Sequence, residues 1–121
     1  MEGEDEMKGA PAPHIAIDPA GVRVRVTVAG EVLADTRDAL AMKEGAYPVV
    51  YYFPRQDVKM DRLARTVHRS YCPFKGHASY WSLKGGAENA VWSYEDPYDD
   101  MAVIKGRLAF YADKVDSITT E

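Results

Sequence analysis

The run Val22–Val28 constrains the fold more than any other segment of this 121-residue chain. Valine alternates with arginine or threonine along the whole run, and most of its residues are β-branched. Side chains of a β-strand point alternately to the two faces of a sheet, so this pattern predicts a strand with one buried face. Ala29-Gly30 then supplies a tight turn into Glu31–Asp35, and together these segments predict a β-hairpin.

Short segments of strand character recur along the rest of the chain, between turns rich in glycine and proline. They favour a mainly β fold: one small domain of seven to eight short, mostly antiparallel strands with one or two short helices. The further expected strands are Ala39–Lys43, Val49–Phe53, Arg65–Cys72, Gly76–Leu83, Ala90–Tyr94 and Arg107–Tyr111.

Two brief helical segments are expected between the strands. Asp57 is a suitable N-cap for one or two turns over residues 58–63. Asp96 is a suitable cap for a second helix that begins at Pro97 and runs to Ile104, with Gly106 after its end. Capping also accounts for the acidic residues around Pro97, so we expect no metal site there.

The chain has room for a single domain, which we expect to span residues 14–116. Residues 1–13 are acidic and contain small residues and prolines, so they are expected to form a disordered leader. Residues 117–121 are expected to be a C-terminal tail.

The charge distribution disfavours nucleic acid as a partner. Four of the 19 acidic residues and one of the 15 basic residues lie in residues 1–13, which leaves 15 acids and 14 bases for the remainder. A body that is nearly neutral lacks the basic face that neutralises phosphates. No apolar run approaches the ~20 residues of a membrane span, so no membrane partner is expected. With a single cysteine and no secretory signal, a cytoplasmic location is the expectation.

The loop between Cys72 and His77 is the first candidate site. If the flanking segments pair as a hairpin, these two residues lie opposite each other, with Cβ atoms roughly 4.5–5.5 Å apart. A thiol beside an imidazole, with Lys75 nearby to favour the thiolate, is the environment of an activated nucleophile. Cys72 and His77 are therefore the candidate catalytic residues, although a lone cysteine is more often a small buried apolar residue and a histidine in a strand is more often simply hydrogen-bonded.

Aromatic residues form the second candidate site. They come from three predicted strands and exceed what a core of this size needs, so the excess is expected to line a pocket for a flat or apolar ligand. Two polar residues near them in the chain, Arg55 and Lys75, could hold a polar group of such a ligand. The candidate ligand-binding residues are Tyr52, Arg55, Lys75, Tyr80, Trp81, Trp92 and Tyr94. We expect no cofactor and no metal, since the cysteines and carboxylates of a transition-metal site are missing from the pattern.

Four strings of residues resemble a known family. They are Tyr51-Tyr52-Phe53-Pro54 with Asp57-Val58, Cys72-Pro73-x-Lys75-Gly76-x-Ala78-x-Tyr80-Trp81, Trp92-x-Tyr94-x-x-Pro97, and Ile104-Lys105-Gly106 with Ala109-Phe110-Tyr111. In this order they are similar to the small bacterial domain-of-unknown-function family four-two-seven, over about residues 22–116. Some catalogues describe that family as nucleotidyltransferase-like.

The resemblance implies a β-tent fold, of the type shared with methionine sulfoxide reductase B, the Mss-four-like proteins and the cereblon thalidomide-binding domain. Those relatives generally hold a structural zinc between two cysteine pairs, which this chain does not have, so its fold is expected to stand without metal. Their aromatic cage makes an aromatic pocket more credible here, by analogy. Nucleotidyl transfer finds no support in motifs, since a Gly-Ser turn with paired aspartates and a phosphate-cradling glycine loop are both missing.

Three functional hypotheses remain open at this point. The first is a small-molecule-binding domain with an aromatic pocket near the Cys72–His77 loop, whose partner is a small molecule of unidentified chemistry. The second is an enzyme that uses Cys72 as nucleophile and His77 as base. The third is a protein-interaction or dimerisation module that pairs through an exposed strand edge, for which a homodimer is the natural assembly.

Overall fold

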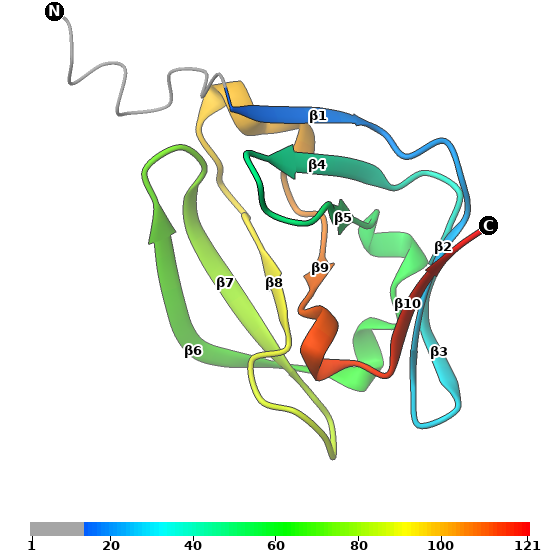
Figure 1. Cartoon of the computed structure of the whole chain (residues 1–121). Helices are drawn as coiled ribbons and strands as arrows, with labels where there is room; N and C mark the ends of the chain where they lie inside the picture. Colours follow the sequence, from blue (N-terminus) through cyan, green and yellow to red (C-terminus); the bar gives the residue numbers. More distant parts are fainter. Residues whose placement is uncertain (1–13) are drawn as a thin grey trace, which may run out of the picture.

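The computed structural model describes residues 14–121, which form three small antiparallel sheets (Figure 1). Their strand orders are β1-β4-β5, β10-β2-β3 and β6-β7-β8-β9. The strands are β1 (Ile15–Pro19), β2 (Val24–Val28), β3 (Glu31–Thr36), β4 (Leu40–Glu44), β5 (Val50–Tyr52), β6 (Leu63–Cys72), β7 (Gly76–Leu83), β8 (Val91–Ser93), β9 (Ala109–Phe110) and β10 (Ser117–Thr120). The mainly β fold expected from the sequence is confirmed.

Each of the eight expected strands is present, with ends that shift by at most two residues, and the two additional strands lie near the ends of the described chain. Residues 117–120, expected as a tail, form strand β10 and pair with β2 from Ser117↔Thr27 to Thr120↔Val24. This strand gains its stability from a distant segment, which a local pattern of four residues does not reveal. Strand β1 likewise pairs with β4. The expected leader, residues 1–13, lies outside the described residues.

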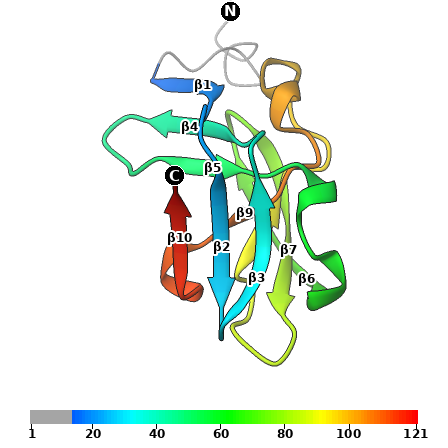
Figure 2. The ribbon, with the colours of Figure 1, turned by 90° about the vertical axis from the view of Figure 1, so that its right-hand side faces the viewer.

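The β2–β3 hairpin has the tight turn that its sequence predicts. Ala29 and Gly30 both adopt positive φ, at 52° and 80°. Two successive positive φ angles are typical of a two-residue turn whose twist matches that of the flanking strands. The Ala29 amide also donates a hydrogen bond to the Asp116 carboxylate at 2.7 Å, which ties the turn to the segment before β10. Figure 2 shows β10, β2 and β3 side by side.

The sheet β6–β9 separates two apolar cores because its side chains alternate between its two faces. Trp81, Val91 and Phe110 pack on one face with residues of β2 and β3. Tyr80 and Ala109 pack on the other face with residues of β4 and β5, such as Met42 and Tyr52. The side chains of this second core therefore come from two sheets. The cavity described below lies between them.

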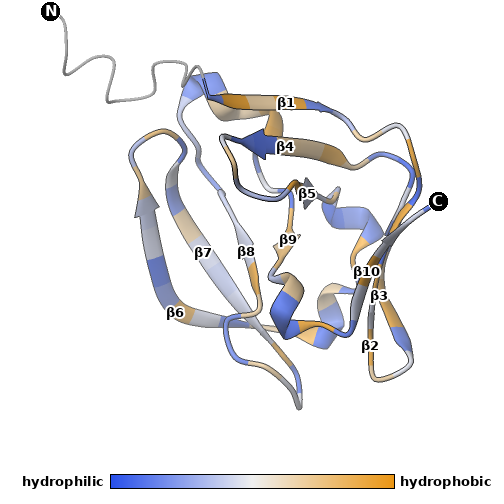
Figure 3. Cartoon of the chain, in the orientation of Figure 1, coloured by the Kyte–Doolittle hydropathy of each residue, from blue (hydrophilic) through white to orange (hydrophobic). Residues whose placement is uncertain are grey.

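Strand β6 lies at one edge of its sheet. Its register with β7 shifts between Arg65 and Arg69, so residues 66–68 bulge from the ladder. Much of this strand is blue or pale in Figure 3, in keeping with a solvated edge. A bulge and charged side chains are common features that discourage an edge strand from pairing with another chain.

The helical segments are all short 3₁₀ turns: η1 (Arg55–Asp57), η2 (Met60–Arg62), η3 (Asp99–Ile104) and η4 (Ala112–Lys114). The expected caps are wrong. Asp57 ends η1 and accepts a hydrogen bond from the Thr36 hydroxyl at 2.7 Å, rather than capping a helix over residues 58–63. Helix η3 begins after Tyr98, not after Asp96, because Tyr98 stays extended and donates its amide to the Lys75 carbonyl.

This hydrogen bond, at 3.0 Å, holds the β6–β7 turn against the segment before η3. Gly76 lies in the turn with a φ of +116°, and an added Cβ would lie 3.5 Å from the Asp96 carbonyl and from the Pro97 Cα atom. Residues with a side chain rarely adopt such a φ. Gly76 therefore allows the turn to present the preceding residue, Lys75, to the protein interior, where it is buried.

Replacement of Gly76 by alanine is expected to lower the free energy of unfolding by about 1–3 kcal/mol, because the backbone is strained there for any L residue. Gly85→Ala is the matched control, since Gly85 has a φ of +75° and open space around its Cβ position. It lies near the left-handed helical region, where alanine costs about 1 kcal/mol. Urea unfolding measures both values, and equal losses would contradict a special role for Gly76.

Candidate functional site

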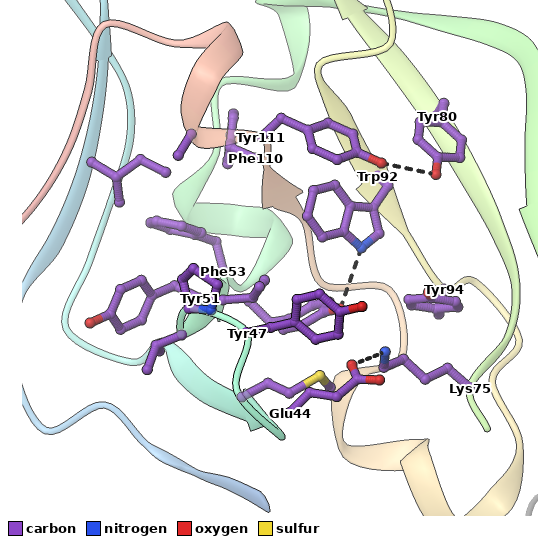
Figure 4. A pocket seen from close by; sticks show the side chains of 17 residues that line it. Glu44, Tyr47, Tyr51, Phe53, Lys75, Tyr80, Trp92, Tyr94, Phe110 and Tyr111 are labelled. Carbon is purple, nitrogen blue, oxygen red and sulfur yellow. Dashed lines mark hydrogen bonds and ion pairs between the residues drawn. The ribbon is translucent and has the colours of Figure 1, made fainter. Parts of the chain in front are cut away.

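A cavity of about 640 Å³ lies between the β4–β5 hairpin and the sheet β6–β9 (Figure 4). Nine of the 17 side chains that line it are aromatic, and six of the eight tyrosines of the chain are among them. In the described part of the chain, two of the lining residues are charged, Glu44 and Lys75. The lining consists of Met42, Glu44, Tyr47, Pro48, Val49, Val50, Tyr51, Tyr52, Phe53, Lys75, Tyr80, Trp92, Tyr94, Phe110, Tyr111, Ala112 and Ile118.

The indole of Trp92 is the central wall of this cavity. Its ring stands perpendicular to that of Tyr52, with centroids 6.4 Å apart, and its Nε1–H donates to the Tyr52 hydroxyl at 3.3 Å. The ring of Tyr111 lies against the other side, 4.5 Å from centroid to centroid. The contact with Tyr52 is edge-to-face, a favoured geometry of aromatic pairs, and the contact with Tyr111 is tilted at 44°, so Trp92 is packed between two rings.

A network of hydroxyl groups closes one end of the aromatic wall. The Tyr80 hydroxyl lies 3.3 Å from the hydroxyl of Tyr111 and 2.9 Å from that of Ser70. The two tyrosine rings are nearly parallel, at 12°. These hydrogen bonds fix the rings of Tyr80 and Tyr111 while leaving their carbon faces toward the cavity side of the sheet.

Lys75 and Glu44 form the charged end of the cavity. The Lys75 Nζ atom donates to the Glu44 Oε1 atom at 2.7 Å, and the two side chains are 9% and 25% exposed. The other carboxylate oxygen lies 3.7 Å from the His14 Nε2 atom. Because a buried ammonium is costly without a partner, the ion pair is what allows Lys75 to point inward.

Three tyrosines of the cavity, Tyr52, Tyr94 and Tyr111, are held in their neutral form. Burial is the main cause that raises the pKa of Tyr52 and Tyr94, and it raises the pKa of Tyr111 to about 12. These three phenols therefore remain able to donate hydrogen bonds throughout the physiological pH range. The Tyr94 side chain is buried and forms part of the cavity lining.

Five of the seven predicted ligand-binding residues line this cavity: Tyr52, Lys75, Tyr80, Trp92 and Tyr94. The other two, Arg55 and Trp81, lie on the opposite face of the sheet. There the guanidinium groups of Arg55 and Arg65 lie over the Trp81 ring, 5.2 and 5.0 Å from its centroid. Alternation along β7 places Trp81 on the face opposite its neighbour Tyr80, so the two rings cannot share a pocket.

The structure does not bring Cys72 and His77 together. Cys72 is opposite Gly76 and Tyr71 is opposite His77, one residue out of the expected register. Consecutive residues point to opposite faces, so Cys72 packs against the second core while the His77 side chain is exposed beside the ring of Tyr71. His77 instead borders a separate acidic hollow formed with Asp96, Asp99 and Asp100.

Comparison with known families identifies the chain. A family model described as Domain of unknown function (DUF427), with the short name NTP_transf_9, matches residues 16–121. The chain belongs to this family. No curated protein matches the chain. The match begins one residue into β1 and ends after β10, so this DUF427 domain takes in every strand of the described fold.

The DUF427 domain contains no helix, within residues 14–121, that is long and apolar enough to cross a membrane. Within the same residues, no three side chains among histidine, cysteine, aspartate and glutamate are grouped as they would be around a metal ion.

Several lining residues of the cavity were not among the predicted site residues. Glu44 follows the expected strand 39–43 by one residue, and it shares the inward face of Leu40 and Met42 in β4. Extending the alternation of Leu40 and Met42 by two residues would have predicted Glu44 on the same face. Tyr111 belongs to one of the strings that resemble the family. Tyr47 is 71% exposed in the β4–β5 loop, and no sequence pattern places it at the mouth of the cavity.

On the Trp81 face, Arg55 Nη1 donates to the Glu95 carboxylate at 3.1 Å and to the Gly106 carbonyl at 2.9 Å. Burial acts to raise the pKa of Glu95, but hydrogen bonds from Ser93 and Arg55 and the positive charge of Arg55 outweigh it. The pKa of this carboxyl is therefore lower than its ordinary value.

Glu95→Gln is expected to lower the free energy of unfolding at pH 7 by about 0.5–1 kcal/mol, since the ion pair is partly exposed. A lowered pKa in the folded state stabilises the fold above the unfolded pKa, about 4.3, and this contribution is lost as pH falls through the folded pKa. The difference between wild type and variant should therefore shrink below about pH 4 in urea unfolding experiments. A difference that is constant from pH 3 to 7 would contradict the role of ionised Glu95.

Proposed function

We propose that this domain binds a small organic molecule in the cavity between the β4–β5 hairpin and the sheet β6–β9. The observation that carries the proposal is the cavity itself: about 640 Å³, walled mainly by aromatic rings, with a single ion pair at one end. Binding sites for small molecules are typically concave, have this range of volume, and combine apolar walls with few polar groups.

The ordering of the walls supports binding rather than simple core packing. In a closed core, rings fill the space between elements at crystal-like density. Here the rings of Tyr52, Trp92 and Tyr111 support each other, yet they border open volume. A flat ligand would gain stacking and apolar burial without displacing any of these contacts.

The neutral tyrosines supply orientation to such a ligand. Tyr52, Tyr94 and Tyr111 can donate from neutral hydroxyl groups, and Lys75 donates one of its three N–H groups to Glu44. A ligand with a polar group at this end of the cavity would lie beside the Lys75–Glu44 pair and could accept a hydrogen bond from the ammonium. The hypothesis of a Cys72–His77 enzyme receives no comparable support, since the register separates these side chains.

A screen of small aromatic compounds is expected to yield binders that perturb the indole N–H signal of Trp92 and leave that of Trp81 unchanged. The two tryptophans lie on opposite faces of one sheet, so they are an internal control in ¹H–¹⁵N spectra. Trp92→Ala removes the central wall and is expected to weaken binding by about tenfold or more.

Trp81→Phe is the matched control for that variant, because it changes the same residue type in the same sheet outside the cavity. It is expected to bind the same compounds with unchanged affinity. Compounds that shift only the Trp81 signal, or a library without any binder, would contradict the proposed function.

A further inference from the structure

The charges of Lys75 and Glu44 indicate which class of small molecule fits the cavity. We infer that the pocket selects an uncharged planar ring compound whose polar edge carries a hydrogen-bond acceptor for Lys75 and a donor for Glu44, as a carboxamide does. This inference rests on the proposed function, since it concerns the ligand of that same site.

The first step is the charge balance. Among residues 14–121, Lys75 and Glu44 are the two charged residues of the lining, and they neutralise each other at 2.7 Å. An anionic ligand that approached the Lys75 ammonium would also meet the Glu44 carboxylate, and a cationic ligand that approached Glu44 would meet Lys75. Either ion would lose its hydration in the cavity, and its opposite charge there would already be paired with the other residue. The free-energy cost of removing water from a charge is large in a poorly solvated site.

The second step is hydrogen-bonding capacity. The ammonium has three N–H groups, and the structure shows one acceptor for them, Glu44 Oε1. The carboxylate of Glu44 has lone pairs beyond those used by Lys75. A donor and an acceptor thus lie side by side at one end of the cavity, as Figure 4 shows. A carboxamide presents a carbonyl oxygen and an N–H group on one edge, so it complements both partners without breaking the ion pair.

The third step is the shape of the walls. The Trp92 ring is flanked by Tyr52 at 90° and by Tyr111 at 44°, and the hydrogen bond from Trp92 Nε1 to Tyr52 keeps the first pair fixed. Rings held at such angles offer a face to one flat partner and edges to its rim. The walls accordingly favour a planar ring, while the charged end orients its polar edge.

Three compounds of the same shape test this inference: benzoate, benzamide and benzamidinium carry charges of −1, 0 and +1. Their dissociation constants are measured at pH 8, where an ordinary histidine is neutral, by following the Trp92 indole signal. Wild type is expected to bind benzamide about tenfold or more tightly than either ion, because only the amide avoids an uncompensated charge.

Substitution of either partner of the ion pair is expected to change the order of affinities. Glu44→Gln leaves the positive charge of Lys75, so benzoate should become the tightest ligand of the series. Lys75→Met leaves the negative charge of Glu44, so benzamidinium should become the tightest. Glu88→Gln is the matched control, since Glu88 is an exposed acid outside the cavity lining, and it should keep the order of wild type.

The outcomes separate the two proposals. If the aromatic screen yields ligands of the Trp92 face but wild type prefers benzoate or benzamidinium to benzamide, the charge inference is overturned and the binding function stands. An unchanged order in both folded ion-pair variants also overturns it. If neither the screen nor this series perturbs Trp92, the binding function fails as well. If one variant fails to fold, the order of affinities in wild type and in the other variant still tests the charge inference.

Discussion

The ion pair between Lys75 and Glu44 is the interaction on which the cavity depends. It joins the β6–β7 turn to the end of β4, so it links two of the three sheets at this end of the cavity. Each charge compensates the burial of the other, and the removal of one partner would leave the second uncompensated. The turn geometry at Gly76 and the hydrogen bond from Tyr98 to the Lys75 carbonyl both position this lysine.

Most strands of the fold were predictable because their own residues carry the pattern of a β-strand. Alternation in the run that includes β2, the turn at Ala29-Gly30, and the aromatic segments of β5 and β8 each carry their own signal. What the pattern did not reveal was pairing over long range. Strand β10 is four residues that become a strand because β2 offers an unpaired edge, whereas their local sequence predicts a tail.

The candidate site was predictable in part, for the same physical reason. Aromatic excess indicates Tyr52, Trp92 and Tyr94, because a small core does not need so many rings, and all three line the cavity. The register of β6 against β7 was harder to predict than the presence of the aromatic residues. A shift of one residue in the β6–β7 turn exchanges the faces of its side chains, and it separates Cys72 from His77. The same alternation excludes Trp81 from the cavity, although its neighbour Tyr80 lines it.

The two faces of the sheet β6–β9 have a further consequence for how such a domain can diversify. In β7 and β8, Tyr80 and Trp92 border the cavity, whereas their neighbours Trp81 and Val91 pack into the core on the opposite face. Changes at positions 80 and 92 would alter the cavity walls while Trp81 and Val91 keep their contacts with the opposite core. The cavity wall and the packing of the opposite core thus depend on neighbouring positions of the same short strands. If the proposed binding function holds, such a scaffold could acquire new ligands by substitution alone, without insertions in its loops.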